Sequence, residues 1–293
     1  MPRLTIGLPV YNGALLIEEC LKNLGNQAYT DFEVIISDNA STDGTTEYCA
    51  EFAAKDRRFR HIVHTKTSSA NDNFLYVRDI ADSDYFAFRA FDDLSSRNYV
   101  ADLVQMLDDV PNARLAVGRI QKQFGGPHRV RGYQYPLSPS ADRGPVLKRI
   151  LRQMYQGQAS WFYGVWRREA LVESFDRVLR EYDDPWGCDH LILLHAMLNG
   201  GICGTREGAS FTQRVLQTER HYIPTKRPSY DTMISRNRWF YKVASELVKE
   251  CNLPSLDRRA VTAMLPLFTL RRCHGTKRLA QGILKKWASR HSI

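Results

Sequence analysis

The first 120 residues alternate short apolar segments with segments of helical periodicity, and this pattern restricts the fold more than any other feature of the chain. Such alternation is typical of βαβ units, in which helices join parallel strands and cover the sheet. We therefore predict an α/β domain with a mixed or mainly parallel sheet flanked by helices. The predicted strands cover residues 4–8, 32–37, 61–64, 85–91 and 114–118, and the predicted helices cover 14–24, 45–54, a segment ending near 81, and 98–107.

The pattern changes twice further along the chain. Residues 121–145 are rich in Gly, Pro, Arg and Ser, which predicts a long surface loop. Beyond residue 225 only helical periodicity remains. We predict one domain over residues 1–225, with halves at 1–120 and 121–225, and a basic helical appendage over 226–293.

The composition is typical of a soluble globular protein. Of 293 residues, 43% are apolar, and no run reaches the roughly 18 apolar residues that cross a bilayer. Pro9 interrupts the apolar N-terminal stretch, which therefore predicts a strand and not a signal peptide. The six cysteines are scattered without a CxxC pair, as expected for reduced thiols in the cytoplasm.

The net charge of +9 admits three kinds of partner: nucleic acid, an anionic membrane surface, or phosphorylated substrates. No aromatic-and-basic motif of known spacing supports nucleic acid, so none is predicted as a partner. Much of the excess lies in residues 271–293, where apolar positions at helical spacing predict a basic amphipathic helix. Such a helix either lies on an anionic membrane surface or packs on the rest of the chain with its basic face in water.

Three polar clusters follow predicted strands: Pro9 to Asn12, Asp38-Asn39, and Asp92-Asp93. Taken singly, each has a structural explanation, as a turn, a helix cap or a solvated loop. In an open parallel sheet, however, ligands bind outside the carboxyl ends of the strands. Because all three clusters fall at such ends, they predict one shared binding edge.

These segments carry a family resemblance. The sequences PVYNG, DFEVIISDNASTDGT and YFAFRAFDDL resemble, in order and spacing, the family 2 inverting glycosyltransferases with a GT-A fold. The resemblance continues more weakly at WFYGVWRREAL and GCDHLILLHAMLNGG. It implies a GT-A nucleotide-binding fold and transfer of a sugar from a nucleotide-diphospho-sugar to an acceptor hydroxyl.

The resemblance assigns roles in donor binding. It implies that Tyr11 lies beside the base and that Asp38 accepts hydrogen bonds from the base or ribose, as a carboxylate facing N–H or O–H donors does. The residues implied to contact the nucleotide-sugar are Pro9, Tyr11, Asn12, Asp38, Asn39, Asn73 and Asp92.

The resemblance also implies a divalent metal, Mn²⁺ or Mg²⁺, held by Asp93 and Asp92, with His221 as a weaker candidate. A cation with hard oxygen ligands neutralises the diphosphate as the sugar–phosphate bond breaks. This chain departs from the family pattern, because Phe91 stands where a first acid is usual. That departure leaves open a catalytically degenerate relative that binds a nucleotide-sugar or a protein partner.

Asp189 corresponds to the family's general base, which deprotonates the acceptor hydroxyl as it attacks. Its structural alternative is a cap on the following helix, and both roles are compatible. Trp161, Tyr163 and Trp166 form either an aromatic floor for an acceptor sugar or part of a core. The donor is expected to be a UDP-, GDP- or dTDP-sugar, and the acceptor a saccharide or lipid-linked saccharide of surface polysaccharide biosynthesis.

Other nucleotide-binding classes fit less well. A nucleotidyltransferase would place a Gly- and Arg/Lys-rich loop after the first strand, where this chain has PVYNGALLIEE. A Rossmann dehydrogenase needs GxGxxG there, and a P-loop enzyme needs GK[ST]; neither motif is present. We therefore predict a cytoplasmic glycosyltransferase, peripheral on the membrane if the basic tail binds lipid.

Overall fold

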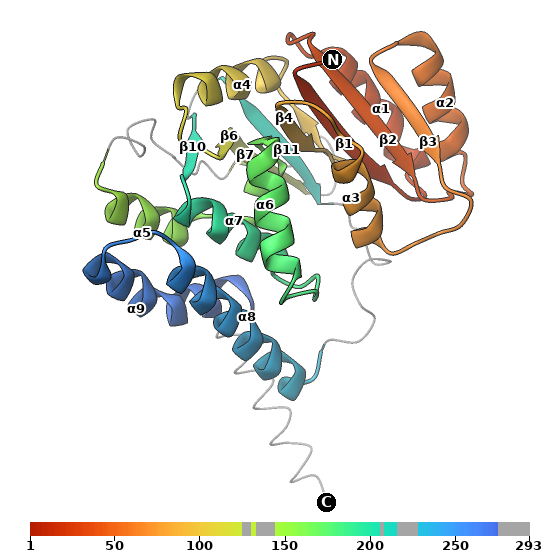
Figure 1. The fold of residues 1–293 in the computed structure, drawn as a ribbon. Coiled ribbons are helices and arrows are strands. Elements are labelled where there is room, and N and C mark those ends of the chain that lie inside the picture. The colour runs from red at the N-terminus through yellow and green to blue at the C-terminus, as the bar shows by residue number, and fades with distance from the viewer. Residues whose placement is uncertain (125–129, 133–143, 206–207, 216–227, 275–293) are drawn as a thin grey trace, which may run out of the picture. The chain divides into compact units, whose positions relative to one another are not determined.

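The computed structural model describes residues 1–124, 130–132, 144–205, 208–215 and 228–274 (Figure 1). The chain divides into two compact units. The first contains Met1–Arg143, Ser160–Glu173 and Ile202–Gln217, and the second contains Gly144–Ala159, Ser174–Gly201 and Thr218–Ile293.

The first unit is built on a seven-stranded sheet with the strand order β10-β6-β9-β4-β1-β2-β3. Most neighbours are parallel, but β9 runs antiparallel to both β4 and β6, so the sheet is mixed as predicted. Its strands are β1 (Leu4–Val10), β2 (Phe32–Asp38), β3 (Phe59–Val63), β4 (Tyr85–Phe88), β6 (Leu115–Val117), β9 (Val165–Arg167) and β10 (Ile202–Gly204).

Helices cover both faces of this sheet. The connections β1–α1–β2 and β2–α2–β3 advance in one direction, and the connection through α3 returns to β4 on the other side of β1, so the right-handed rule places α3 on the opposite face. Figure 1 shows α3 in front of the strands, with α1 and α2 behind them. The helices of this unit are α1 (Ala14–Gly25), α2 (Thr45–Lys55), α3 (Ala70–Asp79) and α4 (Tyr99–Asp109), and α6 (Arg168–Leu179) begins in it.

The central strands are apolar because both of their faces are covered. Every residue of β1 is buried. Pro9 is tolerated in this central strand because pairing with β4 ends at Gly7–Phe88, so its missing N–H removes no ladder hydrogen bond on that side. Gly7 lets the side chains of Phe86 and Val77 pack closely against the backbone of β1, because a Cβ at this position would lie 2.7 Å from both of them.

A second, four-stranded sheet has the order β5-β11-β7-β8. It corrects the prediction of a continuous loop over residues 121–145, because β7 and β8 fall largely in that range. The alternating sequence RIQKQF of β7 pairs in parallel with β11, which lies some ninety residues later and has no strongly apolar pattern of its own. The strands are β5 (Leu94–Ser95), β7 (Arg119–Phe124), β8 (Val130–Gly132) and β11 (Ser210–Val215).

The second unit is helical. It contains α5 (Val146–Gln156), α7 (Cys188–Leu198), α8 (Tyr230–Glu250) and α9 (Ser255–Arg272). Ser229 caps α8, since its side chain accepts the Thr232 N–H at 3.1 Å. Phe240 of α8 and Phe268 of α9 lie in the buried contact between these helices, with ring centroids 5.7 Å apart.

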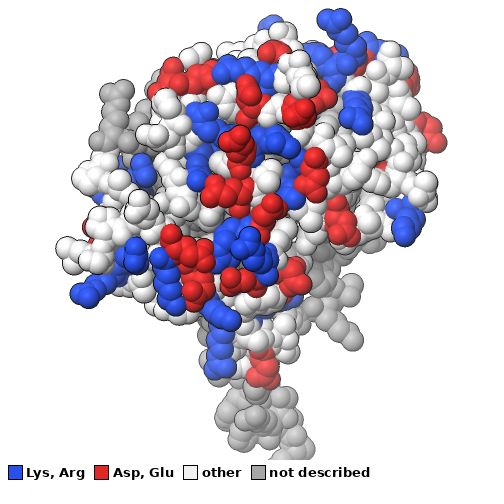
Figure 2. Space-filling model, viewed as in Figure 1, with Lys and Arg blue, Asp and Glu red and all other residues white. Residues whose placement is uncertain are grey.

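Charge and hydropathy add two facts. On the face shown in Figure 2, acidic and basic side chains are interspersed, so the positive excess does not form one continuous patch there. Within the part of the chain that the structure describes, none of the helices combines the length and the apolar character needed to cross a bilayer.

Candidate functional site

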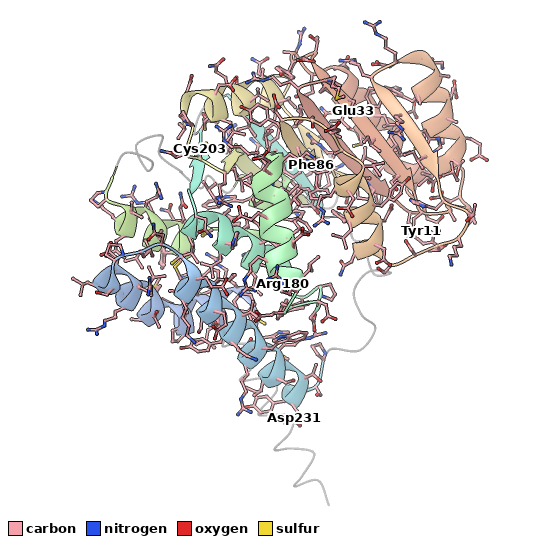
Figure 3. The ribbon with its side chains drawn as sticks, viewed as in Figure 1. Tyr11, Glu33, Phe86, Arg180, Cys203 and Asp231 are labelled. Carbon is pink, nitrogen blue, oxygen red and sulfur yellow. The ribbon has the colours of Figure 1, made fainter. Side chains whose placement is uncertain are left out.

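The carboxyl ends of β1 and β2 meet at one edge of the large sheet. The two strands pair in parallel from Leu4–Phe32 to Val10–Asp38, so the residues that follow them emerge side by side. In Figure 3, Tyr11 lies just beyond the end of β1, and Glu33 marks the opposite end of the strands. Tyr11 is 39% exposed, so its ring is accessible at this edge.

Hydrogen bonds join the two loops at this edge. The Asn12 N–H donates to Ser41 Oγ at 2.9 Å, and the Asn12 side-chain oxygen accepts the Thr42 N–H at 2.9 Å. The Asn39 N–H donates to the Val10 carbonyl at 2.9 Å. Asn12 has a φ of 49°, a left-handed conformation that Asn adopts more readily than most residues. The predicted convergence of the first two clusters is thus present in the structure.

Asp43 joins the starts of the two following helices. Its Oδ2 accepts the Ala14 N–H at 3.1 Å, and its Oδ1 accepts the Thr45 N–H at 3.1 Å. The Thr45 hydroxyl oxygen in turn accepts the Gly13 N–H at 2.8 Å. These bonds satisfy N–H groups that the first turns of α1 and α2 leave without helical partners. The two loops therefore form one braced unit, which we call the double loop (residues 11–13 and 39–45).

Asp38 is fully buried beneath the double loop. Its Oδ1 accepts the Ser41 N–H at 2.9 Å, its Oδ2 accepts the Thr46 hydroxyl at 2.5 Å, and His61 Nε2 lies 3.8 Å from Oδ2. Burial by itself raises the pKa of Asp38. The hydrogen-bonding interactions with His61, Ser41 and Thr46 together lower the pKa by more than burial raises it, so the pKa lies well below its usual range. The carboxylate is thus ionised and bound within the protein.

Replacing Asp38 with Asn should lower the free energy of unfolding by about 1–3 kcal/mol at neutral pH, because a buried charged acceptor is lost. The depressed pKa stabilises the fold above the unfolded value, near 3.9, and this contribution is lost as the pH falls below it. Denaturant titrations across this range should show the gap between wild type and Asp38→Asn closing in acid. A constant gap would contradict this account of Asp38.

Two buried asparagines fix the surroundings of the double loop. The Asn39 side chain donates to the Ser68 carbonyl at 2.9 Å and accepts the Ser68 N–H at 2.8 Å. The Asn73 side chain on α3 accepts the Ser37 hydroxyl and donates to the Ser37 carbonyl at 3.0 Å. Both amides therefore hold neighbouring segments in place, and their predicted contact with a nucleotide stays a prediction.

The acid pair follows β4. This strand ends at Phe88, three residues earlier than predicted, because the chain turns and the Asp93 N–H donates to the Ala90 carbonyl at 3.1 Å. Asp93 is 2% exposed and Asp92 is half-buried. The Oδ1 of Asp93 accepts the backbone N–H of Arg214 at 3.0 Å.

Two buried arginines accompany the acid pair, and the sequence analysis missed both. Arg214 of β11 donates from Nε to the Asp92 carbonyl and from Nη1 to Glu19 at 2.5 Å. Arg89 donates to Ser95 Oγ at 2.9 Å and lies over the Phe211 ring at 5.0 Å. A signal for Arg89 was present, since a charged residue inside the apolar run YFAFRAF needs a buried counter-charge.

Phe91 brings the acid-pair loop against the double loop. A Cβ on Gly13 would lie 2.7 Å from Phe91 Cδ2 and 2.9 Å from Val10 Cγ2. The Phe91 ring therefore packs directly on the backbone of Gly13, where a larger residue would clash. The three predicted clusters thus lie at one edge of the sheet, and Phe91 serves as a packing contact between two of them.

The acid pair is chemically suited to a divalent cation. Burial and the neighbouring Asp92 charge raise the pKa of Asp93, and a bound cation would offset both effects. Within the described residues no hydrogen bond engages Asp93 Oδ2. The described part of the chain contains no group of three or more His, Cys, Asp or Glu side chains placed to hold a metal. Asp92 and Asp93 would therefore supply part of an oxygen ligand set, completed by phosphate and water.

Asp189 lies in the second unit, in the first turn of α7. The helix starts after Gly187, which has a φ of 83° and no side chain to cap the helix. The Oδ1 of Asp189 accepts the His190 N–H at 2.8 Å, and its side chain is half-buried. Because Gly187 occupies the N-cap position, Asp189 is not the helix cap that the structural alternative predicted. Its carboxylate nevertheless lies in the first turn of α7, where a negative charge is favoured.

The remaining residues predicted from the sequence lie in the core, are half-buried, or fall outside the described part of the chain. Trp161 and Trp166 are 1% and 0% exposed, so they belong to the core and the idea of an aromatic floor is wrong for them. Tyr163 is half-buried, with its ring stacked 5.6 Å from that of Phe211. His221 and most of the basic segment 271–293 lie outside the described residues.

Comparison with known proteins identifies relatives. The model of glycosyl transferase family 2 matches residues 5–177, more than half of the chain. A GalNAc(5)-diNAcBac-PP-undecaprenol beta-1,3-glucosyltransferase of Campylobacter jejuni is 26% identical over 110 residues, which cover 37% of this chain and 36% of that protein. The matched segments span less than half the length of the curated relatives.

Solved structures show the same fold. Residues 1–349 of S. aureus TarS, in complex with UDP-GlcNAc, align with a TM-score of 0.68 at 15% identity over 92% of this chain and 73% of that one. The mannosyltransferase PcManGT of Pyrobaculum calidifontis, in complex with GDP-Man and Mn²⁺, aligns with a TM-score of 0.56 at 18% identity over 100% and 76%. The predicted GT-A type α/β fold, with helices at its C-terminal end, is confirmed.

Proposed function

Because this chain belongs to glycosyl transferase family 2, we propose that it transfers a sugar, with inversion, from a nucleotide-diphospho-sugar to an acceptor hydroxyl. The observation that carries this proposal is the sheet edge itself. The double loop and the acid pair follow neighbouring strands at their carboxyl ends, where open α/β sheets bind ligands, and Phe91 packs against Gly13 between them.

The double loop is proposed to bind the nucleoside. Tyr11 is accessible there and offers a flat ring to the base, and exposed Asn12 offers a polar edge. Asp38, Asn39 and Asn73 hold this surface from below through the hydrogen bonds described above. The TarS and PcManGT complexes contain UDP-GlcNAc and GDP-Man, which supports a UDP-, GDP- or dTDP-linked donor without selecting one.

Asp92 and Asp93 are proposed to hold Mn²⁺ or Mg²⁺ beside the diphosphate. When bound, such a cation neutralises charge on the leaving nucleotide. Arg214 supports the acid pair by donating hydrogen bonds to Asp93 Oδ1 and the Asp92 carbonyl, and its guanidinium also donates to Glu19. The presence of Mn²⁺ in the PcManGT complex supports this assignment. His221 stays a candidate ligand from the sequence.

Asp189 is proposed as the general base. An ionised carboxylate would take the proton from the acceptor hydroxyl as that oxygen bonds to the anomeric carbon and the nucleoside diphosphate leaves from the opposite side. Half-burial and the hydrogen bond to the His190 N–H hold the Asp189 carboxylate in a defined orientation. Such pre-orientation is what a general base requires.

For the acceptor we propose a saccharide, free or lipid-linked, of surface polysaccharide biosynthesis. The name of the Campylobacter relative includes a polyprenol-linked saccharide, which supports this class. A peripheral position on the cytoplasmic face of a membrane, reached through residues 271–293, would suit such an acceptor.

The test is binding and slow hydrolysis of a panel of UDP-, GDP-, dTDP- and CMP-sugars by the full chain, with Mn²⁺ or with EDTA. We expect one nucleotide class to bind selectively and to be released only with metal. Isothermal titration calorimetry measures binding independently of turnover. Binding without any hydrolysis would instead support a degenerate relative, and binding of no nucleotide would contradict the proposal.

A further inference from the structure

Basic and apolar side chains share one exposed surface of the second unit, formed by α5 and α9. We call it the α5–α9 face and define it by Lys148, Arg152, Tyr155, Leu267 and Arg271. Tyr155 is 52% exposed and Leu267 is 43% exposed, and Lys148 and Arg271 are exposed as well. Residues 148, 152 and 155 are spaced to lie along one side of α5, and residues 267 and 271 along one side of α9.

Direct contacts join the two helices at this face (Figure 1). The guanidinium carbon of Arg271 lies 4.3 Å from the centre of the Tyr155 ring. Arg272 donates from Nη2 to the carbonyls of Met154 and Tyr155, at 3.2 and 2.7 Å. Arg272 therefore satisfies carbonyls at the C-terminal end of α5, while its neighbour Arg271 stays at the surface over an aromatic ring.

Apolar residues continue along the exposed side of α9. Leu256 is 74% exposed, and Ala263 and Pro266 are also exposed, between Leu256 and Leu267. The buried side of this helix carries Val261, Leu265 and Phe268. Exposed apolar residues thus share the outer side of α9 with the exposed polar residues Arg259 and Thr262, which makes this side amphipathic.

The charge of the two helices is one-sided. The α5 sequence VLKRILRQMYQ contains three cations and no carboxylate. The α9 sequence contains four arginines and the single acid Asp257, at its first turn. On the neighbouring α8, Glu246 pairs with Lys249 and Glu250 pairs with Arg177, so these carboxylates have cationic partners of their own. Lys148 and Arg152 therefore have no acid on their own helix, and the single acid of α9 lies at the opposite end of that helix from Arg271.

We propose that the α5–α9 face binds an anionic lipid surface, with Lys148, Arg152 and Arg271 contacting headgroup phosphates and Tyr155, Leu256 and Leu267 entering the interface. Cations complement the phosphates, while the exposed leucines gain only from an apolar medium, which distinguishes a membrane from a nucleic acid. Tyr155 suits the boundary, because its ring is apolar and its hydroxyl polar. This binding is separate from sugar transfer and does not depend on the donor site.

The test is flotation of the full chain with vesicles of phosphatidylcholine, alone or with about one third phosphatidylglycerol. We expect binding only to the anionic vesicles, and loss of binding at high salt. The triple variant Lys148→Gln/Arg152→Gln/Arg271→Gln should bind about 100-fold more weakly, since each cation near an anionic leaflet is worth about fivefold. A charge-matched control, Arg57→Gln/Arg60→Gln/Arg97→Gln, removes three exposed cations of the first unit and should bind normally.

The variant Leu256→Ser/Leu267→Ser tests insertion while leaving the charges intact. Leu256 is 74% exposed and Leu267 43% exposed, so the fold should be kept, and binding should fall about tenfold or more. Circular dichroism and donor hydrolysis confirm that each variant is folded. Equal vesicle binding by the triple variant and its control, no effect of the leucine variant, or preference for an RNA oligonucleotide over anionic vesicles would overturn the proposal.

Discussion

Asp189→Asn should lower kcat about 10²–10⁴-fold while leaving donor affinity nearly unchanged. An amide cannot take the proton of the acceptor hydroxyl, but its oxygen can still accept the His190 N–H that Asp189 accepts at 2.8 Å. The start of α7 should therefore persist, at a cost of about 0.3–1 kcal/mol for the lost charge at the helix N-terminus. Steady-state transfer kinetics and calorimetric donor binding measure the two quantities separately.

The matched control is Asp183→Asn, which neutralises an exposed carboxylate six residues earlier in the same unit. It should leave kcat unchanged. If Asp189→Asn transferred sugar at the wild-type rate, Asp189 would serve only to orient the first turn of α7, and the base would have to be another residue.

Asp93→Asn should abolish the metal dependence of donor binding and lower kcat/KM by about 10³-fold, because a divalent cation contributes several kcal/mol to stabilising charge on the leaving group. The variant keeps the size of a side chain that is 2% exposed and can still accept the Arg214 N–H. Paramagnetic detection of bound Mn²⁺ with nucleoside diphosphate gives a readout that does not require turnover.

Asp109→Asn is the control for this experiment, since Asp109 is an exposed carboxylate at the end of α4. Thermal unfolding of both variants shows whether any loss reflects misfolding. Retention of tight, EDTA-sensitive donor binding by Asp93→Asn would contradict the assignment of Asp93 as a metal ligand.

The parts of the fold that could be predicted are those with local causes. Strands β1 and β2 and helices α1 and α2 differ from their predicted bounds by two residues at most, because their apolar spacing directly reflects burial. The polar clusters after β1 and β2 could be placed together because parallel strands end at a common edge.

The missed parts depend on contacts between distant segments. Strand β11 reads SFTQRV, a sequence with little strand signal, and it forms only because β5 and β7 pair with it from far away in the chain. Arg214 could not be linked to the acid pair without that pairing. Likewise, the predicted strand over residues 85–91 ran too long, since nothing local in FRAF shows that pairing with β1 stops at Phe88.

Under the proposed function, the bracing of the double loop has a consequence for how donor preference can change. Asn12 contacts both Ser41 and Thr42, and Asp43 contacts both Ala14 and Thr45. The conformation of each loop therefore depends on residues of the other loop. The free-energy effects of substitutions at residues that contact each other are not additive. A single exchange in either loop disturbs the other, whereas compensated pairs can be accepted together. Altered nucleotide preference should therefore arise through epistatic exchanges that span both loops, and a library varied one position at a time would miss them.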